Sequence, residues 1–167
     1  MAYGTPAQAT TTYTFDLDGR MTSLTDAANN VTSFGYDADG NKTSQTDPLN
    51  HTATFAFDVD GRMLSTTDRN GRRRDFTYDS DGHLLTEKWY DAGNSLVQIL
   101  SYSYDADGHM LTASNSAGTY SFHYDALGRL ASVDEPYGVS LAFSYDARGN
   151  RVLVVDSLGG TTSSKYD

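Results

Sequence analysis

The sequence predicts an all-β fold, a tandem array of about seven 21-residue β-hairpin repeats stacked in an antiparallel sheet. Three observations lead to this prediction. A short motif recurs at a nearly constant period, aromatic residues occupy alternate positions before it, and a glycine closes each copy. Each observation corresponds to one part of a hairpin, and the period indicates that the hairpin is the repeated unit.

The recurring motif consists of Phe or Tyr, then Asp, two variable residues and Gly. Its copies contain Phe15, Asp16 and Gly19; Tyr36, Asp37 and Gly40; Phe57, Asp58 and Gly61; Tyr78, Asp79 and Gly82; Tyr104, Asp105 and Gly108; Tyr124, Asp125 and Gly128; and Tyr145, Asp146 and Gly149. The glycines are separated by 21, 21, 21, 26, 20 and 21 residues. Such regular spacing predicts one supersecondary unit stacked on its neighbours.

A second aromatic residue precedes the first by two positions in every copy. These residues are Tyr13, Phe34, Phe55, Phe76, Tyr102, Phe122 and Phe143. Because residues at i and i+2 share one face of a strand, this alternation predicts a strand that ends at the motif. Repeat stacked on repeat, the two sets of rings are expected to form two aromatic ladders stabilised by cross-strand pairs.

The motif itself predicts a tight turn, since Asp bonds its own backbone and Gly readily adopts a positive φ. A returning strand follows, and it leads to a second turn of the same kind. The second turns run from Asp26 to Asn29, Asp47 to Asn50, Asp68 to Gly71, Asn115 to Gly118 and Asp156 to Gly159. Two short strands and two turns therefore make up each repeat, and the motif residues are expected to have a structural role.

Two repeats depart from the period. The fourth gains five residues around Trp89 and Tyr90, which predicts a longer hairpin whose aromatic residues are candidates for contact with a partner. The sixth has Asp134 to Gly138 as a slightly longer turn. Residues 1–11 are interpreted as a leader and residues 12–167 as the array, with the last repeat truncated at Tyr166-Asp167.

Composition excludes several function classes. Twenty-two acidic and twelve basic residues give a net charge of −10, which disfavours binding to nucleic acid. Cysteine is absent, so a disulfide framework and a thiolate metal site are excluded. No apolar stretch approaches the length of a membrane span, so membrane insertion is not expected.

Catalysis and cofactor binding have no candidate residues, and the chain is predicted not to be an enzyme. The serines lack a Gly-x-Ser-x-Gly context, and no phosphate-binding glycine motif is present. The Asp-x-Asp-Gly turns lack the further ligands of an EF-hand, so turn chemistry explains them better, with weak Ca²⁺ binding left open as an alternative. His83 and His109 share one repeat position and are interpreted as polar surface residues rather than metal ligands.

The motif resembles the YD repeat of the Rhs proteins, the Tc-toxin shell subunits and the teneurins, most closely over Phe122 to Leu130 and Phe55 to Met63. The resemblance covers residues 10–167 and implies a spiralling β-sheet that forms a hollow shell around another protein. It therefore predicts a structural wall segment of a secreted or cell-surface protein, whose partner is an enclosed or neighbouring protein.

Two other functions stay open. One is an extracellular module that binds carbohydrate or a cell surface through exposed tyrosines and polar turns. The other is self-assembly, because the open edges of a sheet carry unpaired backbone groups that can join copies of the chain into a ring or a filament.

Overall fold

The computed structural model describes residues 10–167, and it confirms an all-β fold that is one open antiparallel sheet. Fifteen strands are hydrogen-bonded in chain order, so that each strand from β2 to β14 lies between the strands before and after it. They are β1 Thr12–Phe15, β2 Met21–Thr25, β3 Val31–Tyr36, β4 Lys42–Thr46, β5 Thr52–Phe57, β6 Met63–Thr67, β7 Arg73–Tyr78, β8 Leu84–Tyr90, β9 Leu96–Tyr104, β10 Met110–Asn115, β11 Gly118–Tyr124, β12 Leu130–Asp134, β13 Ser140–Tyr145, β14 Arg151–Asp156 and β15 Thr161–Ser163. One short 3₁₀ helix, Pro136–Gly138, lies between β12 and β13.

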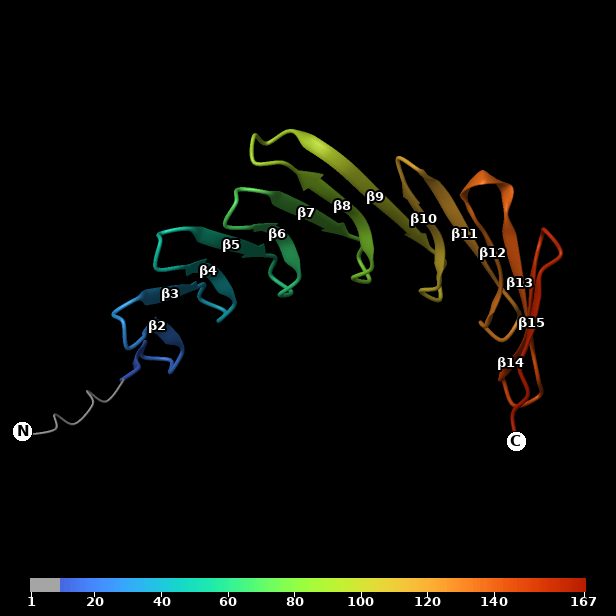
Figure 1. The fold of residues 1–167 in the computed structure, drawn as a ribbon, viewed down its shortest axis with the longest axis horizontal. Coiled ribbons are helices and arrows are strands. Elements are labelled where there is room, and N and C mark those ends of the chain that lie inside the picture. The colour runs from blue at the N-terminus through green and yellow to red at the C-terminus, as the bar shows by residue number, and fades with distance from the viewer. Residues whose placement is uncertain (1–9) are drawn as a thin grey trace, which may run out of the picture. The chain divides into compact units, whose positions relative to one another are not determined.

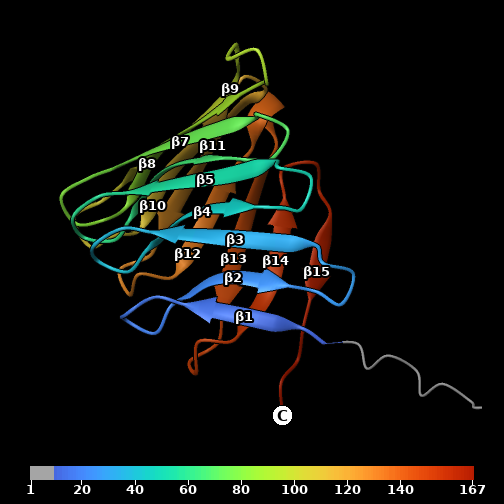
Figure 2. The same ribbon diagram turned by 90° about the vertical axis from the view of Figure 1, so that its left-hand side faces the viewer.

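The sheet divides into two compact units. The first contains residues 10–75 and 90–95, and Figure 2 shows its strands β1 to β5 side by side in chain order. The second contains residues 76–89 and 96–167, and Figure 1 shows its strands β9 to β14 in the same sequential arrangement. In each unit, contacts join strands that are consecutive in the chain, as expected for hairpin repeats. Across residues 10–167, no helix has the length and apolar character needed to cross a membrane.

The motif turns have the predicted geometry. In the first repeat the Gly19 amide donates to the carbonyl of Asp16 at 3.2 Å, and the Asp16 amide donates to the carbonyl of Arg20 at 3.0 Å. Gly19 has φ 79°, a left-handed conformation that glycine adopts without steric cost. The same pair of bonds occurs in all seven motif copies. The strand pairing beside the turn shifts by one residue, as in the first repeat, where Thr14 pairs with Ser23 but Phe15 pairs with Met21.

The second turns follow the same rule with two exceptions. Asn29, Asn50 and Asn94 take the glycine's place with φ values of 64°, 64° and 62°, because asparagine tolerates the left-handed region. One exception is the sixth repeat, where the predicted longer turn contains the 3₁₀ helix Pro136–Gly138 and Tyr137 has a φ of 75°. The other is the turn predicted from Asn115 to Gly118. These two residues pair directly across β10 and β11, so the loop between them has only two residues.

The sheet has a single layer, so very little of it is buried. Among the described residues Val133 is the only buried apolar side chain, with 8% of its surface exposed. It lies on β12 between Phe122 on β11 and Leu141 on β13, which are its direct cross-strand partners. Apolar rows across three strands are therefore the nearest equivalent of a core in this fold.

The aromatic ladders differ in one respect from the prediction. In six hairpins, the direct cross-strand partners of the first aromatic ring are not aromatic. Tyr13 faces Leu24, Phe34 faces Gln45, Phe55 faces Thr66, Tyr102 faces Ala113, Phe122 faces Val133 and Phe143 faces Val154. The reason is topological, since each repeat contributes a returning strand that lies between one aromatic strand and the next.

Two alanine substitutions in motif turns should have unequal effects on stability. Gly149→Ala should cost about 1–2 kcal/mol, because a Cβ at φ 86° is strained although nothing lies within 4 Å of it. Gly128→Ala should cost about 1 kcal/mol more, because its Cβ would lie 2.9 Å from Nε2 of His109. Urea unfolding midpoints of both variants would measure the difference. Equal losses would show that the His109 ring moves aside freely, contrary to the expectation.

Candidate functional site

The candidate site is the contact between consecutive repeats, and its first component is the motif aspartate. In the sixth repeat, Oδ1 of Asp125 accepts bonds from the amides of Leu127 at 2.9 Å and Arg129 at 3.0 Å. Oδ2 accepts the Nε–H of Arg129 at 2.8 Å and pairs with its Nη2 at 2.7 Å. One carboxylate therefore holds both the turn backbone and the side chain four residues later. The side-chain and backbone hydrogen bonds from Arg129 lower the pKa of Asp125 below 3.8.

The second component is that fourth residue after the aspartate, which contacts the tyrosine of the following repeat. His83 stacks on Tyr104 and His109 stacks on Tyr124, each with ring centroids 4.7 Å apart. Arg129 lies over the ring of Tyr145 at 4.5 Å, which is a cation–π distance. The aspartate thus orients a side chain that covers the next repeat's ring.

The third component is a hydrogen bond from the motif tyrosine back to the previous repeat, here named the tyrosine bond. The hydroxyl of Tyr124 donates to the carbonyl of Met110 at 2.9 Å. The same bond joins Tyr36 to Met21 at 2.9 Å, Tyr104 to Leu84 at 3.1 Å, Tyr145 to Leu130 at 2.7 Å and Tyr166 to Arg151 at 3.2 Å. Burial raises the pKa of Tyr104 and Tyr124, with the turn carboxylates of Asp79 and Asp105 adding to the effect. Both hydroxyls therefore keep the proton that they donate.

Trp89 and Tyr90, the predicted partner contacts, lie at the end of β8 before the turn that starts at Asp91. Both are half-buried. The indole Nε1 of Trp89 donates to Glu87 at 2.6 Å, and the guanidinium of Arg73 lies 4.1 Å from the centre of the Tyr90 ring. These contacts give both rings a role within the sheet, and their contact with a partner stays a prediction.

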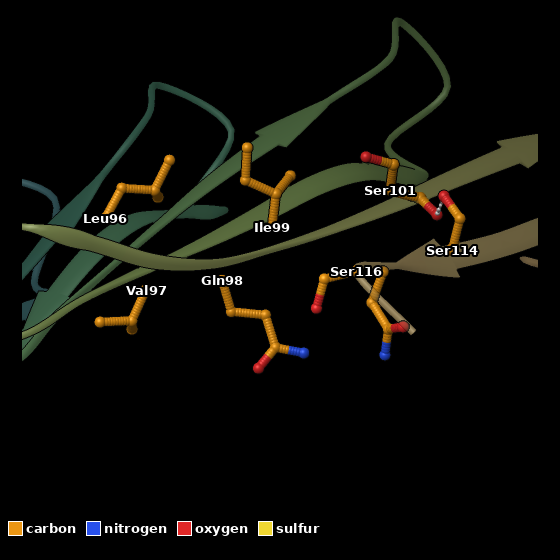
Figure 3. A pocket seen from close by; sticks show the side chains of 8 residues that line it. Leu96, Val97, Gln98, Ile99, Ser101, Ser114 and Ser116 are labelled. Carbon is orange, nitrogen blue, oxygen red and sulfur yellow. Dashed lines mark hydrogen bonds between the residues drawn. The ribbon is translucent and has the colours of Figure 1, made fainter. Parts of the chain in front are cut away.

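The more exposed apolar residues of this hairpin lie on β9. Leu96, Val97 and Ile99 are 49%, 61% and 39% exposed. They border a hollow of about 410 Å³ that reaches Ser101 on the same strand and Ser114 on β10 (Figure 3). The sequence prediction gave the role of partner contact to the aromatic pair and not to these aliphatic residues of the same hairpin, although the Leu-Val-x-Ile pattern of a β-strand was visible in the sequence.

Asp105, Asp107 and His109 are the described residues that come closest to a metal site, with one potential ligand atom from each within 4.8 Å of the others. However, Nδ1 of His109 already bonds Oδ2 of Asp105 at 3.0 Å. His83 makes the same bond to Asp79 at 2.9 Å. The arrangement is therefore the ordinary motif turn with histidine as the fourth residue after the aspartate. The geometry supports the structural interpretation of these turns.

The motif carboxylates should make stability depend on pH. Hydrogen bonds from Arg20, Asn41 and Arg129 lower the pKa values of Asp16, Asp37 and Asp125 below 3.8. A carboxyl with a lower pKa in the folded state stabilises the fold above its unfolded pKa, and this contribution is lost as pH falls through the folded pKa. Urea midpoints should therefore be level from pH 7 to about pH 5 and fall below about pH 4.

Salt provides the control for this pH series. At pH 3 the chain also gains net positive charge, whose repulsion is screened by 0.5 M NaCl. A loss of stability that persists in salt would come from the protonated turn carboxyls. Full recovery in salt, or a loss that is complete by pH 5, would contradict the assignment to the turns.

The teneurin YD-shell family model matches residues 46–164, and the RHS repeat model matches residues 15–52. No curated protein sequence matches.

Several solved structures share the fold. TcdB2-TccC3-TEV has a TM-score of 0.72 at 20% identity, over 93% of this chain and 10% of that chain. TcdB2-TccC3-Cdc42 has a TM-score of 0.72 at 19% identity, with the same coverage. The Tc holotoxin pore of Photorhabdus luminescens has a TM-score of 0.73 at 19% identity, over 92% of this chain and 9% of that chain. This chain spans about a tenth of the length of these structures.

Proposed function

Because the chain belongs to the teneurin YD-shell family, we propose that it is a non-catalytic wall segment of a β-shell that encloses or presents another protein. The tyrosine bond carries the proposal, since it joins a repeat to the one directly before it, as Tyr124 is joined to Met110. Bonding between nearest neighbours suits a wall, because repeats can be added without changing those already in place.

The similar structures support a protein as the partner. Two of them are structures of TcdB2-TccC3 with a further component, which is TEV in one and Cdc42 in the other. This supports a protein partner for the present chain. The acidic charge of −10 and the wide, single-layered sheet agree with a surface that faces a protein rather than a nucleic acid.

Photo-cross-linking from the two faces of the sheet tests enclosure. Thr119 and Tyr120 are consecutive exposed residues of β11, so their side chains point to opposite faces. A cross-linking amino acid at each position, introduced into the protein in its own host, should capture a different protein from one face only. Equal capture from both faces, or none from either, would contradict enclosure.

Self-assembly is the second candidate function, and the open sheet favours it. The end strands β1 and β15 each have one neighbouring strand among the described residues, which leaves a row of backbone groups for another copy. Light scattering after size-exclusion chromatography should then show a mass that rises with concentration. A monomer at high concentration would rule this function out.

Location outside the cell or at its surface is part of the proposal, and fractionation of the host followed by detection of the chain would test it. Carbohydrate binding through exposed tyrosines stays a prediction for a glycan array, where an absence of binding would count against it.

A further inference from the structure

Strand β9 extends beyond the strand beside it. It spans Leu96–Tyr104, but β10 pairs only with Ser101–Tyr104. The next hairpin turns back early, because Asn115 already pairs with Gly118. Residues Leu96–Leu100, here named the free edge, have no paired residue on β10. The N-terminal part of β9 projects past the β10–β11 hairpin, as Figure 1 shows. No described strand lies beside the free edge on the side of β10.

The free edge lacks the features that keep natural sheet edges from pairing. Exposed edges usually carry charged residues or proline. Residues 96–100 read Leu-Val-Gln-Ile-Leu, and residues 114–117 at the tip of the next hairpin read Ser-Asn-Ser-Ala, so neither segment has a charge or a proline. In Figure 3, Leu96 and Ile99 project to one side of β9 and Val97 projects to the other. Apolar side chains thus border the free edge on both sides.

Two hollows flank this place in the sheet. The larger one, about 410 Å³, includes the cross-strand pair Ser101 and Ser114. The smaller one, about 230 Å³, includes Tyr102 and Tyr120, which are both paired with Ala113. The row formed by Ser101 and Ser114 is adjacent along the strands to the row formed by Tyr102, Ala113 and Tyr120, and adjacent residues of a strand point to opposite faces. The side chains of these two rows therefore lie on opposite faces, and the two hollows meet at Ser114 and Asn115, which border both.

A strand added at the free edge would match all of these features. Its backbone would bond that of β9, and its alternate side chains would point to the two faces. We propose that the free edge binds an extended, uncharged segment of another polypeptide, with apolar side chains at alternate positions. This site does not depend on the wall function proposed above.

The available space favours a single strand over a second copy of this hairpin. The free edge is closed at one end by the β10–β11 tip at residues 116–117, which leaves room for about four residues. A second copy of β9 would bring its own turn at residues 91–95 and its paired strand β8 to the same place. A lone peptide strand meets no such obstacle.

Binding of a labelled peptide tests the proposal. A fluorescein-labelled hexapeptide of alternating threonine and valine should give a saturable rise in anisotropy with the intact chain. Hydrogen exchange should slow at the amides of residues 96–100 when the peptide is added. The same peptide methylated at every internal amide nitrogen should bind at least about tenfold more weakly, because it cannot form a strand ladder.

Matched lysine variants locate the site. The double variant Val97→Lys and Ile99→Lys should weaken binding at least about tenfold, because charge on a strand edge opposes pairing. Leu17→Lys and Leu127→Lys place the same charges at exposed turn positions and should leave binding unchanged. No binding at 1 mM peptide, protection confined to β1 or β15, or dimerisation of the free chain with protection of residues 96–100 would each overturn the proposal.

Discussion

Val133→Asp is expected to destabilise the chain by about 3 kcal/mol or more, the largest effect of any single substitution considered for this sheet. Val133 is flanked by Phe122 and Leu141, and it is the described apolar residue with the least exposed surface. An aspartate there would lose hydration without gaining a cationic partner in that row. Val133→Ala should cost about 2 kcal/mol, since it removes two buried methyl groups.

Val31→Asp provides the control for charge in a strand. Val31 lies on β3 opposite Thr25 and is 47% exposed, so an aspartate stays hydrated there and should cost less than about 1 kcal/mol. Urea unfolding followed by far-ultraviolet circular dichroism would compare the variants. Similar losses for Val133→Asp and Val31→Asp would show that the Phe122–Val133–Leu141 row does not act as a local core.

The sequence predicted the hairpins because their determinants are local. Asp16 and Gly19 specify a turn through bonds within five residues, and the alternating Tyr13 and Phe15 specify the strand before it. The turn from Asn115 to Gly118 was predicted with the bounds that the structure gives it, since these two residues pair and enclose a two-residue loop. The Asx-x-x-Gly pattern did not distinguish this direct pairing from the bonding of the other second turns, in which the amide of Asp26 donates to the carbonyl of Asn30.

The contacts between repeats could not be predicted in the same way. The tyrosine bond ends on a main-chain carbonyl, and its acceptors include Met110, Leu130 and Arg151, so the accepting residue has no signature in the sequence. The free edge was missed for a related reason. The free edge depends on how the extra residues of the fourth repeat are divided between β8 and β9. Only the register of β10, which pairs with Ser101–Tyr104, shows which residues of β9 are left without a partner on that side.

Removal of three tyrosine bonds should have an effect almost as large as that of Val133→Asp. The variant combines Tyr104→Phe, Tyr124→Phe and Tyr145→Phe, which keep the rings and delete only the hydroxyls. Each bond is worth about 1 kcal/mol, and bonds in different repeats add approximately, so the triple variant should lose about 3 kcal/mol. Urea midpoints of the three single variants and the triple variant would test both the size and the additivity.

Tyr120→Phe is the control, because the Tyr120 side chain is 42% exposed and its hydroxyl bonds no described residue. It should change the stability by less than about 0.5 kcal/mol. A loss equal to that of Tyr124→Phe would mean that removal of any hydroxyl, rather than of the tyrosine bond, weakens the sheet.

The reverse substitution separates the tyrosine bond from other effects of the ring. Phe57 occupies the motif position in the third repeat, and Lys42 is the residue of the second repeat that corresponds to Met21 and Met110. Phe57→Tyr should supply the missing bond to the Lys42 carbonyl and stabilise the chain by about 1 kcal/mol. A gain at position 57 together with losses at positions 104, 124 and 145 would establish the hydroxyl as the element that joins repeats. The alternative is that the tyrosine bond needs a ring that is covered by the fourth residue after the preceding motif aspartate, as Arg20 covers Tyr36 at 5.2 Å. The absence of a gain at position 57 would limit the tyrosine bond to repeats with such a covered ring.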